Sequence, residues 1–516
     1  MTDAAPDLST DPTTSVFWTT AAEDRAWPPL EADAEADVAI VGGGLVGLAA
    51  AHMLGEAGLR VVVLEAARIG RQATGRSTAK VTSQHGTMYR TLARDIGEGG
   101  ARLYGQANQE ALGWIVARAA GRPDLLQRSA NYVYADKASQ TSTLREEAEI
   151  AAKLGLPAAF VPHLDIRAEN HGAVVFEDQA QIEPCAFLQA LAADVPGNVR
   201  IHENTRVLEV KHGDPCTLRT ARHVVRAKWT IVATQMPVIP EGLFFARAFP
   251  QAHPVIAAPC EDVEPTGMYI TAGKPSRSFR FARRGDVTFI VAAGEIFKPG
   301  ETASQARAFR GLADWLARTF GVKDAPFRWV NEDFEPMDGL PFVGAATAKT
   351  PRLLVATGFN AWGLTTSVAS ARLLADTIQD RTHPLARIFD ATRLRAKGGP
   401  RFAMENAWSG VAMVRDRVLN AKIGKIEGIA PGEGRIVKHG GKQVAVSCGP
   451  SGELTAVSAV CTHLGCIVGW NPEDRSWDCP CHGSRFTAAG EVIAGPAVKP
   501  LEPVALEAET EAKAAS

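Results

Sequence analysis

Two short apolar runs near the start of the chain flank a segment with the composition of a helix. Residues 37–41 and 60–64 are continuous hydrophobic runs of the kind that forms buried parallel strands, and residues 48–57 lie between them. A run of glycines separates the first strand from the helix. The order of strand, helix and strand predicts a β-α-β unit with a parallel sheet.

The hydrophobic pattern of the remaining chain predicts a helical segment, several strands, a long helix and a small β region. Residues 101–155 are predicted to be helical from apolar positions such as Leu144, Ala148, Ala151 and Leu154. Strands are predicted within residues 198–210, 228–234, 278–281 and 287–293. Residues 403–421 have the pattern of one amphipathic helix, and short strands separated by turns follow it.

Length and composition agree with at least two soluble domains. The chain has 516 residues, of which 46% are hydrophobic, so burial of two cores is possible. The net charge is −2, which gives no support for nucleic-acid binding. The most apolar stretch, residues 38–57, contains five glycines and Glu56, so no transmembrane span is predicted. The first residues lack a basic and then apolar leader, so we expect a cytoplasmic protein.

The turn after the first predicted strand has the spacing G-x-G-x-x-G. Gly42, Gly44 and Gly47 supply the glycines, and Glu65 stands 18 residues after the last of them. Such glycines allow a pyrophosphate to approach the helix N-terminus, whose free N–H groups favour phosphate. An acid at the end of the second strand accepts hydrogen bonds from ribose hydroxyls. A dinucleotide site is predicted, with a glycine-rich turn that binds no nucleotide as the alternative.

Three further segments favour FAD as the dinucleotide. Residues 70–77 form a polar loop, residues 338–344 read D-G-L-P-x-x-G, and residues 353–363 predict a strand and a glycine turn. Together these motifs resemble FAD enzymes of the D-amino-acid oxidase and glycine oxidase superfamily, and the segment from Ala36 is most similar to γ-glutamylputrescine-oxidase-like proteins. The resemblance implies FAD contacts at Gly42, Gly44, Gly47, Glu65, Thr74, Gly75, Arg76, Ser77, Val207, Gly358, Asn360, Gly363, Leu364 and Thr365.

A second group of ligand residues lies near the C-terminus. Cys461 and His463 form C-x-H, and Cys479 and His482 form C-x-x-H after 15 intervening residues. Two thiolates and two imidazoles are the ligands of a Rieske [2Fe–2S] centre, with the cysteines on one iron and the histidines on the other. Zinc is the competing interpretation, because the same pairs make tetrahedral sites. A structural disulfide cluster is a third.

Additional residues in both loops favour the iron–sulfur cluster. Gly465 and Gly483 permit tight turns that bring backbone amides towards the sulfurs, and Ser484 follows as a hydroxyl donor. Each loop also carries one more cysteine, Cys466 or Cys481. We therefore predict a one-electron redox centre.

The sequence CTHLGC…CPCHGS resembles the Rieske proteins of cytochrome bc complexes, in which a disulfide joins the two loops. The resemblance implies a Cys466–Cys481 disulfide, and residues 495–497 resemble the loop that covers the cluster. One residue departs from the family pattern, because Phe486 stands where high-potential members have a tyrosine. Loss of a hydroxyl donor near a cluster sulfur predicts a lower reduction potential.

Residues that contact the substrate are harder to find in the sequence. His85 follows the flavin-side loop, and Arg280 lies on a predicted strand from which it could bind a carboxylate. An ordinary core or surface histidine and an exposed strand arginine are the competing interpretations. Amine oxidation by a flavin needs no obligatory protein base, so the lack of a clear acid–base pair does not argue against an enzyme.

The combined prediction is an α/β FAD-binding Rossmann-type domain interleaved with an antiparallel-sheet α+β substrate domain, followed by a small all-β Rieske domain. The predicted boundaries are an N-terminal arm at 1–35, the flavin unit at 36–393, a linker helix at 394–427 and the Rieske domain at 428–516. Within the flavin unit, the FAD part is predicted at about 36–130, 180–235 and 331–390.

The two predicted centres together suggest a reaction class. We expect an FAD-dependent oxidoreductase that oxidises an amine or amino acid and passes electrons through the cluster to a one-electron carrier. One alternative is a reductase that receives electrons through the cluster. Another is a redox-sensing or electron-transfer protein without small-molecule turnover.

Overall fold

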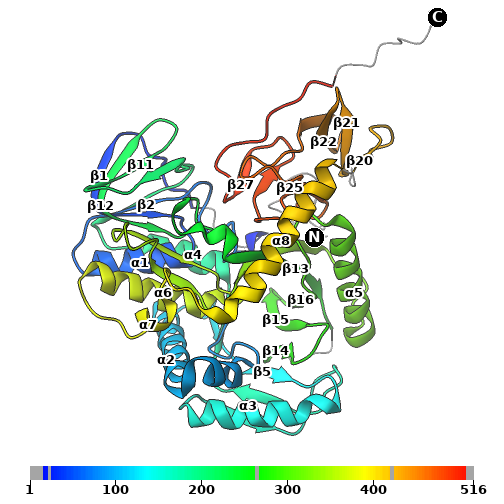
Figure 1. Cartoon of the computed structure of the whole chain (residues 1–516). Coiled ribbons are helices and arrows are strands. Elements are labelled where there is room, and N and C mark those ends of the chain that lie inside the picture. Colours follow the sequence, from blue (N-terminus) through cyan, green and yellow to red (C-terminus); the bar gives the residue numbers. More distant parts are fainter. Residues whose placement is uncertain (1–15, 21–24, 262–265, 419–422, 507–516) are drawn as a thin grey trace, which may run out of the picture.

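The computed structural model describes residues 16–20, 25–261, 266–418 and 423–506. Figure 1 shows a flavin-type sheet with helices, a second large sheet beside it, and a small β domain reached by one long helix. Among the helices in these ranges, none combines the length and apolarity needed to span a membrane.

The first sheet has a parallel core with antiparallel strands at its edges. Its core runs β9-β2-β1-β12-β19, with the bounds Val199–His202, Val61–Leu64, Ala34–Val41, Val224–Val232 and Leu353–Thr357. The antiparallel edges are β10 (Glu209–Lys211), β11 (Cys216–Arg219) and β18 (Phe342–Ala345). The predicted β-α-β unit is present as β1, α1 (Leu45–Glu56) and β2.

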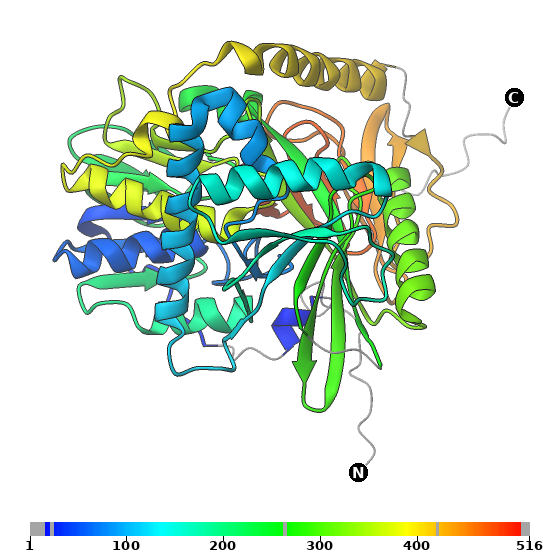
Figure 2. The ribbon, with the colours of Figure 1, turned by 90° about the horizontal axis from the view of Figure 1, so that it is seen from below.

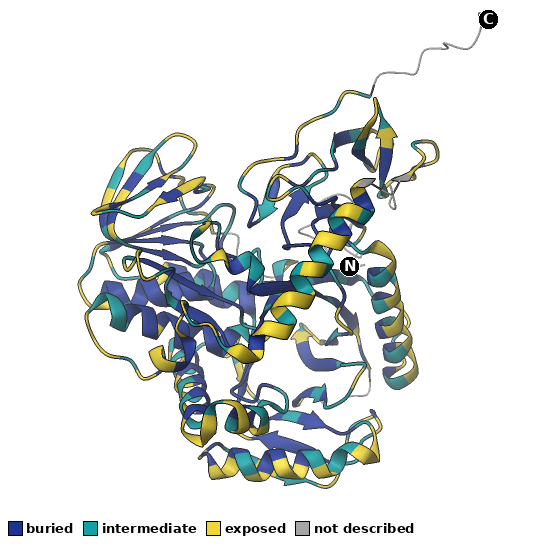
Figure 3. Cartoon of the chain, in the orientation of Figure 1, coloured by how far each residue is buried: buried dark blue, intermediate teal, exposed yellow. Residues whose placement is uncertain are grey.

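Helices pack on this parallel sheet and shield it from solvent. Buried α1 lies against α6 (Gly363–Ile378), and α6 contacts α2 (Met88–Arg118). Two smaller helices, α4 (Pro184–Ala193) and α7 (Ala386–Phe389), complete this part. Figure 3 shows mostly buried residues in α1 and in the centre of this sheet, where β2 and β19 are buried throughout, and exposed residues at its edge.

The second sheet is almost entirely antiparallel and corresponds to the part of the chain expected to bind substrate. Its order is β17-β13-β16-β15-β14-β5-β7-β6, and only the β14–β5 pairing is parallel. The bounds in that order are Phe327–Pro336, Ala248–Pro259, Val287–Ala293, Ser278–Arg284, Met268–Thr271, Asn131–Tyr134, Ala173–Phe176 and Ala158–Val161. Figure 2 shows α3 (Thr141–Lys153) lying across these strands, with α5 (Thr302–Phe320) beside them.

Short elements join the two sheets. A three-stranded sheet contains β3 (Lys80–Val81), β8 (Ala180–Ile182) and β4 (Leu126–Arg128). The 3₁₀ turn η1 (Phe17–Thr20) is buried, so part of the predicted N-terminal arm belongs to the core. Because strands of the two large sheets alternate along the chain, the interleaved fold class is confirmed.

The C-terminal domain consists of two small sheets. One runs β20-β21-β22-β23, with the bounds Ile423–Gly424, Gly434–His439, Lys442–Cys448 and Leu454–Ser458. The other runs β24-β25-β26-β27, with the bounds Gly469–Asn471, Ser476–Asp478, Arg485–Thr487 and Val492–Ala494. The predicted linker helix is present as α8 (Gly399–Val418), which crosses the face of the molecule in Figure 1; the end of its predicted range, 419–421, lies outside the described residues.

The small domain also packs directly on the flavin unit. Arg328 of β17 pairs with Glu473 at 2.6 Å, and Gln305 of α5 donates to Asn471 Oδ1 at 2.6 Å. A buried contact joins Arg76 Nη2 to Asp474 Oδ1 at 2.5 Å. Two of these contacts involve β17 and α5, on the side of the second sheet, and the third involves the loop after β2.

Candidate flavin and iron–sulfur sites

A cavity of about 280 Å³ lies between the two large sheets, and the C-terminal domain closes part of it. The turn after β1, the end of β2 and the start of α6 contribute one side of its wall. Residues of β13, β14, β15 and β17 contribute the substrate side. The C-terminal domain adds Ile493, Ala494, Gly495 and Val498.

The three fingerprint glycines have different neighbours. Gly42 has φ +109°, and a Cβ there would lie 2.6 Å from Ala233 O. A Cβ at position 47 would collide with Gly42 O. A Cβ at Gly44 would instead meet only Thr74 Oγ1, at 3.6 Å. Gly44 therefore keeps open a space that the protein's own atoms do not fill, as a pyrophosphate requires.

Glu65 ends β2 in the wall of the cavity. Its carboxylate accepts hydrogen bonds from Gly43 N at 2.7 Å and Ala67 N at 2.9 Å. Burial raises the pKa of Glu65, and the two amides oppose this shift. A half-buried carboxylate fixed at this position suits the ribose hydroxyls of a dinucleotide, so these residues fit FAD.

The loop at residues 70–77 contributes only part of what the sequence suggested. Thr74 and Ser77 line the cavity, whereas Gly75 serves the loop itself, because a Cβ there would collide with Gly70 O. The side chain of Arg76 turns away to Val330 O at 2.9 Å and to Asp474. The guanidinium of Arg76 thus lies in the domain interface and is not part of the cavity wall.

The segment after β19 brings the N-terminus of α6 to the cavity. Gly358, Gly363, Leu364 and Thr365 all line it, as does Val207 from the other side of the first sheet. Asn360 is the exception among the residues predicted here. It lies in a left-handed turn at φ 51°, where its N–H donates to Phe334 O at 3.2 Å. Its role is to shape the turn, and it is not part of the cavity wall.

The cluster loops present two imidazoles with free ligand atoms. The rings of His463 and His482 lie 5.0 Å apart at 85° to each other. The Nδ1 atoms of both rings are buried without a hydrogen-bond partner. Burial lowers the pKa of His463 to about 4 and that of His482 to about 3, so both rings are neutral. Two buried, unpartnered and neutral imidazole nitrogens are what a metal centre needs.

The two free thiols of these loops face each other. The thiol of Cys479 donates to the sulfur of Cys461, which lowers the pKa of Cys461. The N–H of His463 and the hydroxyl of Ser484 also stabilise the Cys461 thiolate, and the N–H of His482 stabilises the Cys479 thiolate. The predicted donors towards the sulfurs are therefore in place, and the residues present fit a [2Fe–2S] cluster.

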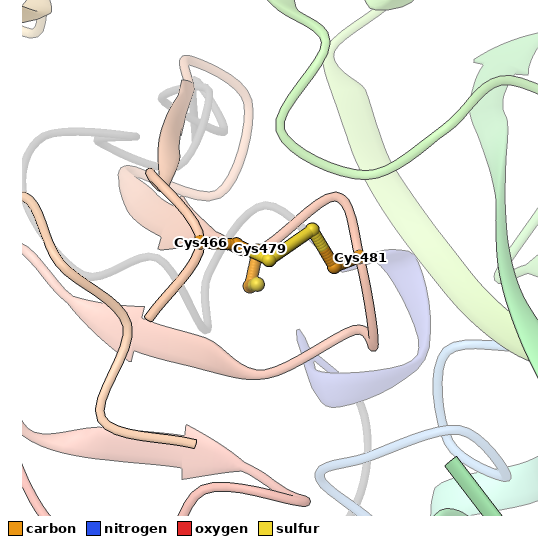
Figure 4. Close-up of side chains that lie close together, drawn as sticks. All are labelled: Cys466, Cys479 and Cys481. Atoms are coloured by element: carbon orange, nitrogen blue, oxygen red, sulfur yellow. A yellow bond between two sulfur atoms is a disulfide. The ribbon is translucent and has the colours of Figure 1, made fainter. Parts of the chain in front are cut away.

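A disulfide between Cys466 and Cys481 joins the two loops, as the resemblance implied, with 6.6 Å between the Cα atoms. Figure 4 shows Cys479 beside it, with all three sulfurs within 4.8 Å of one another. Two of these sulfurs are bonded to each other, so this trio is not a ligand set. The ligand set is the four-residue group described above.

The surroundings of the cluster loops include the residues expected from the covering loop. Ser484 Oγ accepts a hydrogen bond from Ala497 N at 3.0 Å, which ties the covering loop to the second ligand loop. Phe486 is fully buried and stands opposite Trp477 in the β25–β26 pairing.

Comparison with known proteins identifies both parts of the chain. The FAD dependent oxidoreductase family matches residues 37–377, and the Rieske [2Fe-2S] domain family matches residues 420–505. The chain belongs to the FAD dependent oxidoreductase family. The Rieske match decides between iron and zinc, so this oxidoreductase binds FAD and a [2Fe–2S] cluster.

Individual relatives share one or both parts of the oxidoreductase. A Rieske 2Fe-2S iron-sulfur protein of Bacillus subtilis, YhfW, is 33% identical over 501 residues, which cover 95% of this chain and 97% of the relative. γ-Glutamylputrescine oxidoreductase of Escherichia coli is 30% identical over 234 residues, 43% of this chain and 54% of that protein. The glycine oxidase structure from Geobacillus kaustophilus has a TM-score of 0.56 and 18% identity, covering 70% of this chain and all of that one, and shows a shared fold.

His85 lies in the cavity wall of the oxidoreductase, but both of its nitrogens are occupied. Nε2 lies 3.0 Å from Thr82 O, so it carries the hydrogen, and Nδ1 accepts from the Tyr104 hydroxyl at 2.6 Å. The ring stacks on Trp362 with centroids 4.9 Å apart. Burial lowers the pKa of His85 to about 3, so a neutral histidine supports the wall.

Arg280 does not reach the cavity. Its Nε donates to Thr78 O at 2.7 Å, its Nη2 donates to Ile182 O at 2.8 Å, and its guanidinium stacks over Trp18. The side chain is buried, so the exposed-arginine interpretation is wrong as well. The guanidinium N–H groups that were expected to bind substrate are thus bonded to the backbone carbonyls of Thr78 and Ile182. No local sequence pattern reveals such partners.

Sequence reasoning missed five charged residues of the cavity wall, which are Arg68, Lys80, Arg206, Glu332 and Asp333. Asp333 accepts hydrogen bonds from Phe334 N, at 2.7 Å, and from Ala361 N, and burial raises its pKa to about 6. No sequence motif marks either Asp333 or Lys80.

The ligand imidazoles of the oxidoreductase face its flavin unit. Phe245, in the 3₁₀ turn η3 (Glu241–Ala246), contacts both rings edge to face, at 4.8 Å from His463 and 5.2 Å from His482. The peptide N–H groups that follow Cys461 and Cys479 hold the other side of the ligand set. The two imidazoles that would hold one iron of the cluster therefore face the flavin unit.

Proposed function

We propose that this oxidoreductase oxidises an amine or amino acid at its FAD site and passes the electrons through the Rieske cluster to an external one-electron carrier. The names of two relatives support the substrate class, since one is a γ-glutamylputrescine oxidoreductase and the other a glycine oxidase. Bound FAD supplies a two-electron acceptor and the cluster a one-electron relay.

The contact of Phe245 with both ligand imidazoles is the observation that carries the proposal. This contact supports the proposal because the two imidazoles that would hold the cluster face the unit with the flavin cavity. The C-terminal domain also supplies Gly495 and Val498 to the cavity wall itself. This continuity supports transfer of electrons inside one chain, without dissociation of the domains.

The cavity residues suit an amine. Both sheets and the C-terminal domain contribute walls to the space. An amine must be neutral to give up a hydride, so its ammonium form has to lose a proton. Asp333, with its pKa raised to about 6 and two amides fixing its carboxylate, is placed to accept that proton.

An anaerobic substrate screen tests the proposal. Holoprotein is mixed with glycine, proline, both enantiomers of alanine, and putrescine, while flavin absorbance and the paramagnetic resonance signal of the cluster are followed. We expect bleaching of the flavin first and then appearance of the reduced-cluster signal. Asp333→Asn should slow bleaching most above about pH 6, where the wild-type carboxylate is ionised and can accept the proton of the ammonium substrate. The difference should shrink below about pH 6, where Asp333 itself is protonated.

Two other outcomes would replace the proposal. Reduction of the flavin only after a reduced one-electron donor has been added would reverse the direction and make the protein a reductase. Failure of every amine and every donor to reduce the flavin would favour a redox sensor.

A further inference from the structure

Lys80 enters the cavity from β3 and reaches the substrate-side sheet. Its Nζ donates to Tyr269 O at 3.0 Å on β14 and to Ser278 Oγ on β15. The side chain is half-buried and lines the cavity. An ammonium group has three N–H donors, so one remains for a ligand in the cavity.

No carboxylate of the described residues pairs with Lys80. The charged group that acts on it is Arg280, which has the same sign, and burial together with this repulsion lowers the pKa of Lys80 to about 7. An enclosed cation without a counter-charge is unfavourable unless a ligand supplies one. A bound anion would stabilise the ammonium form and use its free donor.

The two arginines in the cavity wall, Arg68 and Arg206, already have partners within the protein. Arg68 forms a salt bridge with Glu203 at 2.7 Å, and Arg206 donates to Val492 O at 2.7 Å. Both therefore act at the end of the cavity where β2 and the C-terminal domain meet. Among the described wall residues, Lys80 is the cation that is bonded to the substrate-side strands.

An unpaired acceptor lies in the same wall. Asn331, on β17, has a buried Oδ1 atom without a hydrogen-bond partner. Such an atom is satisfied by an N–H donor of a ligand. The substrate side thus offers a cation for an anionic group and an acceptor for an amine.

We propose that Lys80 Nζ binds a carboxylate of the substrate, so the substrate is an amino or imino acid and not a simple diamine. This inference rests on the proposed amine oxidation at the FAD site. It assigns to Lys80 the carboxylate-binding role that the sequence had suggested for Arg280.

The test uses acetate as the probe, with neutral acetamide of the same shape as the control ligand. Binding to holoprotein is measured from the change in the flavin absorption spectrum for wild type, Lys80→Met and Lys80→Arg. Lys153→Met, on the outer surface of α3, is the control variant. We expect Lys80→Met to weaken acetate binding about 10- to 100-fold, Lys80→Arg to weaken it less, and acetamide binding to be equal in all.

The same variants separate the alternatives. If Lys80→Met shifts the flavin reduction potential but leaves acetate affinity unchanged, Lys80 acts on the flavin ring and the inference is wrong. Putrescine reducing the wild-type flavin as readily as alanine would also overturn it, while leaving the proposed amine oxidation intact. Lys80-dependent acetate binding in a protein that no amine reduces would support the anion site and refute the proposed function. Full flavin and iron content serves as the folding check.

Discussion

The three fingerprint glycines show how one motif combines two kinds of constraint at the scale of single residues. Gly42 and Gly47 lie against backbone carbonyls that leave no room for a Cβ, whereas a Cβ at Gly44 would meet only Thr74 Oγ1 beside the cavity. A substitution at Gly44 should therefore impair FAD binding, whereas a substitution at Gly47 should impair the stability of the fold.

Gly44→Val should fold and lose FAD. A side chain there meets little protein but fills the space for the pyrophosphate, so FAD affinity should fall about 10-fold or more. Gly47→Ala, which collides with Gly42 O, should instead lower the melting temperature of the whole flavin unit. Flavin content after gel filtration, with cluster absorbance as an internal reference, measures both effects. Stoichiometric flavin in Gly44→Val would show that the nucleotide lies elsewhere.

Ser484 should tune the cluster potential. Its hydroxyl stabilises the Cys461 thiolate, and a donor to a ligating sulfur favours the more negative reduced state. Ser484→Ala should therefore lower the reduction potential, on the order of 50 mV, whereas Ser484→Thr should retain most of it. Voltammetry of the holoprotein provides the measurement. An unchanged potential in the alanine variant would mean that the hydroxyl serves only Ala497 N.

The expectation that Phe486, which lacks the hydroxyl of a tyrosine, lowers the reduction potential of the cluster stays a prediction. Phe486 packs in the fully buried core opposite Trp477, so a tyrosine there must find a partner for its hydroxyl. Phe486→Tyr should raise the potential only if that partner is a cluster sulfur. If the hydroxyl finds none, loss of stability will accompany an unchanged potential.

At the scale of elements, the sequence predicted those helices, strands and turns that depend on residues close together in the chain. The β1-α1-β2 unit, the glycine turns and the two ligand loops follow from short runs of sequence, and their order carries the fold class. The side-chain directions of Arg76 and Arg280 cannot be predicted from such short runs of sequence. Arg76 adjoins the cavity residue Ser77 in sequence, yet its guanidinium turns to Asp474, a partner 398 residues away. Such choices depend on long-range packing, which periodicity does not encode.

The loop disulfide is an element-scale feature with a measurable effect. Cys466 and Cys481, 15 residues apart, hold the ligand loops together, and such a link is worth about 3 kcal/mol to the folded form. Cys466→Ser should assemble the cluster but lose it at least several-fold faster in the presence of an iron chelator. Cys448→Ser, which removes a buried free thiol of the same domain, is the control. Equal loss rates would show that the loops are held by packing alone.

At the scale of the whole molecule, two kinds of ion pair join the C-terminal domain to the flavin unit. Asp474 is buried between Arg76 of the flavin unit and Arg485 of its own domain, each at 2.5 Å. The Arg328–Glu473 pair lies closer to the surface. Removal of one partner from a buried pair leaves an uncompensated charge, whereas a partly exposed pair contributes little.

Asp474→Asn should therefore loosen the docked domain, at a cost of about 3–5 kcal/mol, while Glu473→Gln should cost about 1 kcal/mol or less.

Burial acts to raise the pKa of Asp474, but the charges of Arg76 and Arg485 outweigh it and hold that pKa below its usual value. A lowered carboxyl pKa stabilises the fold above the unfolded-state pKa, and the effect is lost as the pH falls through the folded-state pKa. The difference in unfolding free energy between wild type and Asp474→Asn should thus be constant from about pH 5 to 8 and shrink below about pH 4. Denaturant titrations across this range measure it, and a difference that already disappears near neutral pH would mean that Asp474 is not the charge that holds Arg76 in the interface.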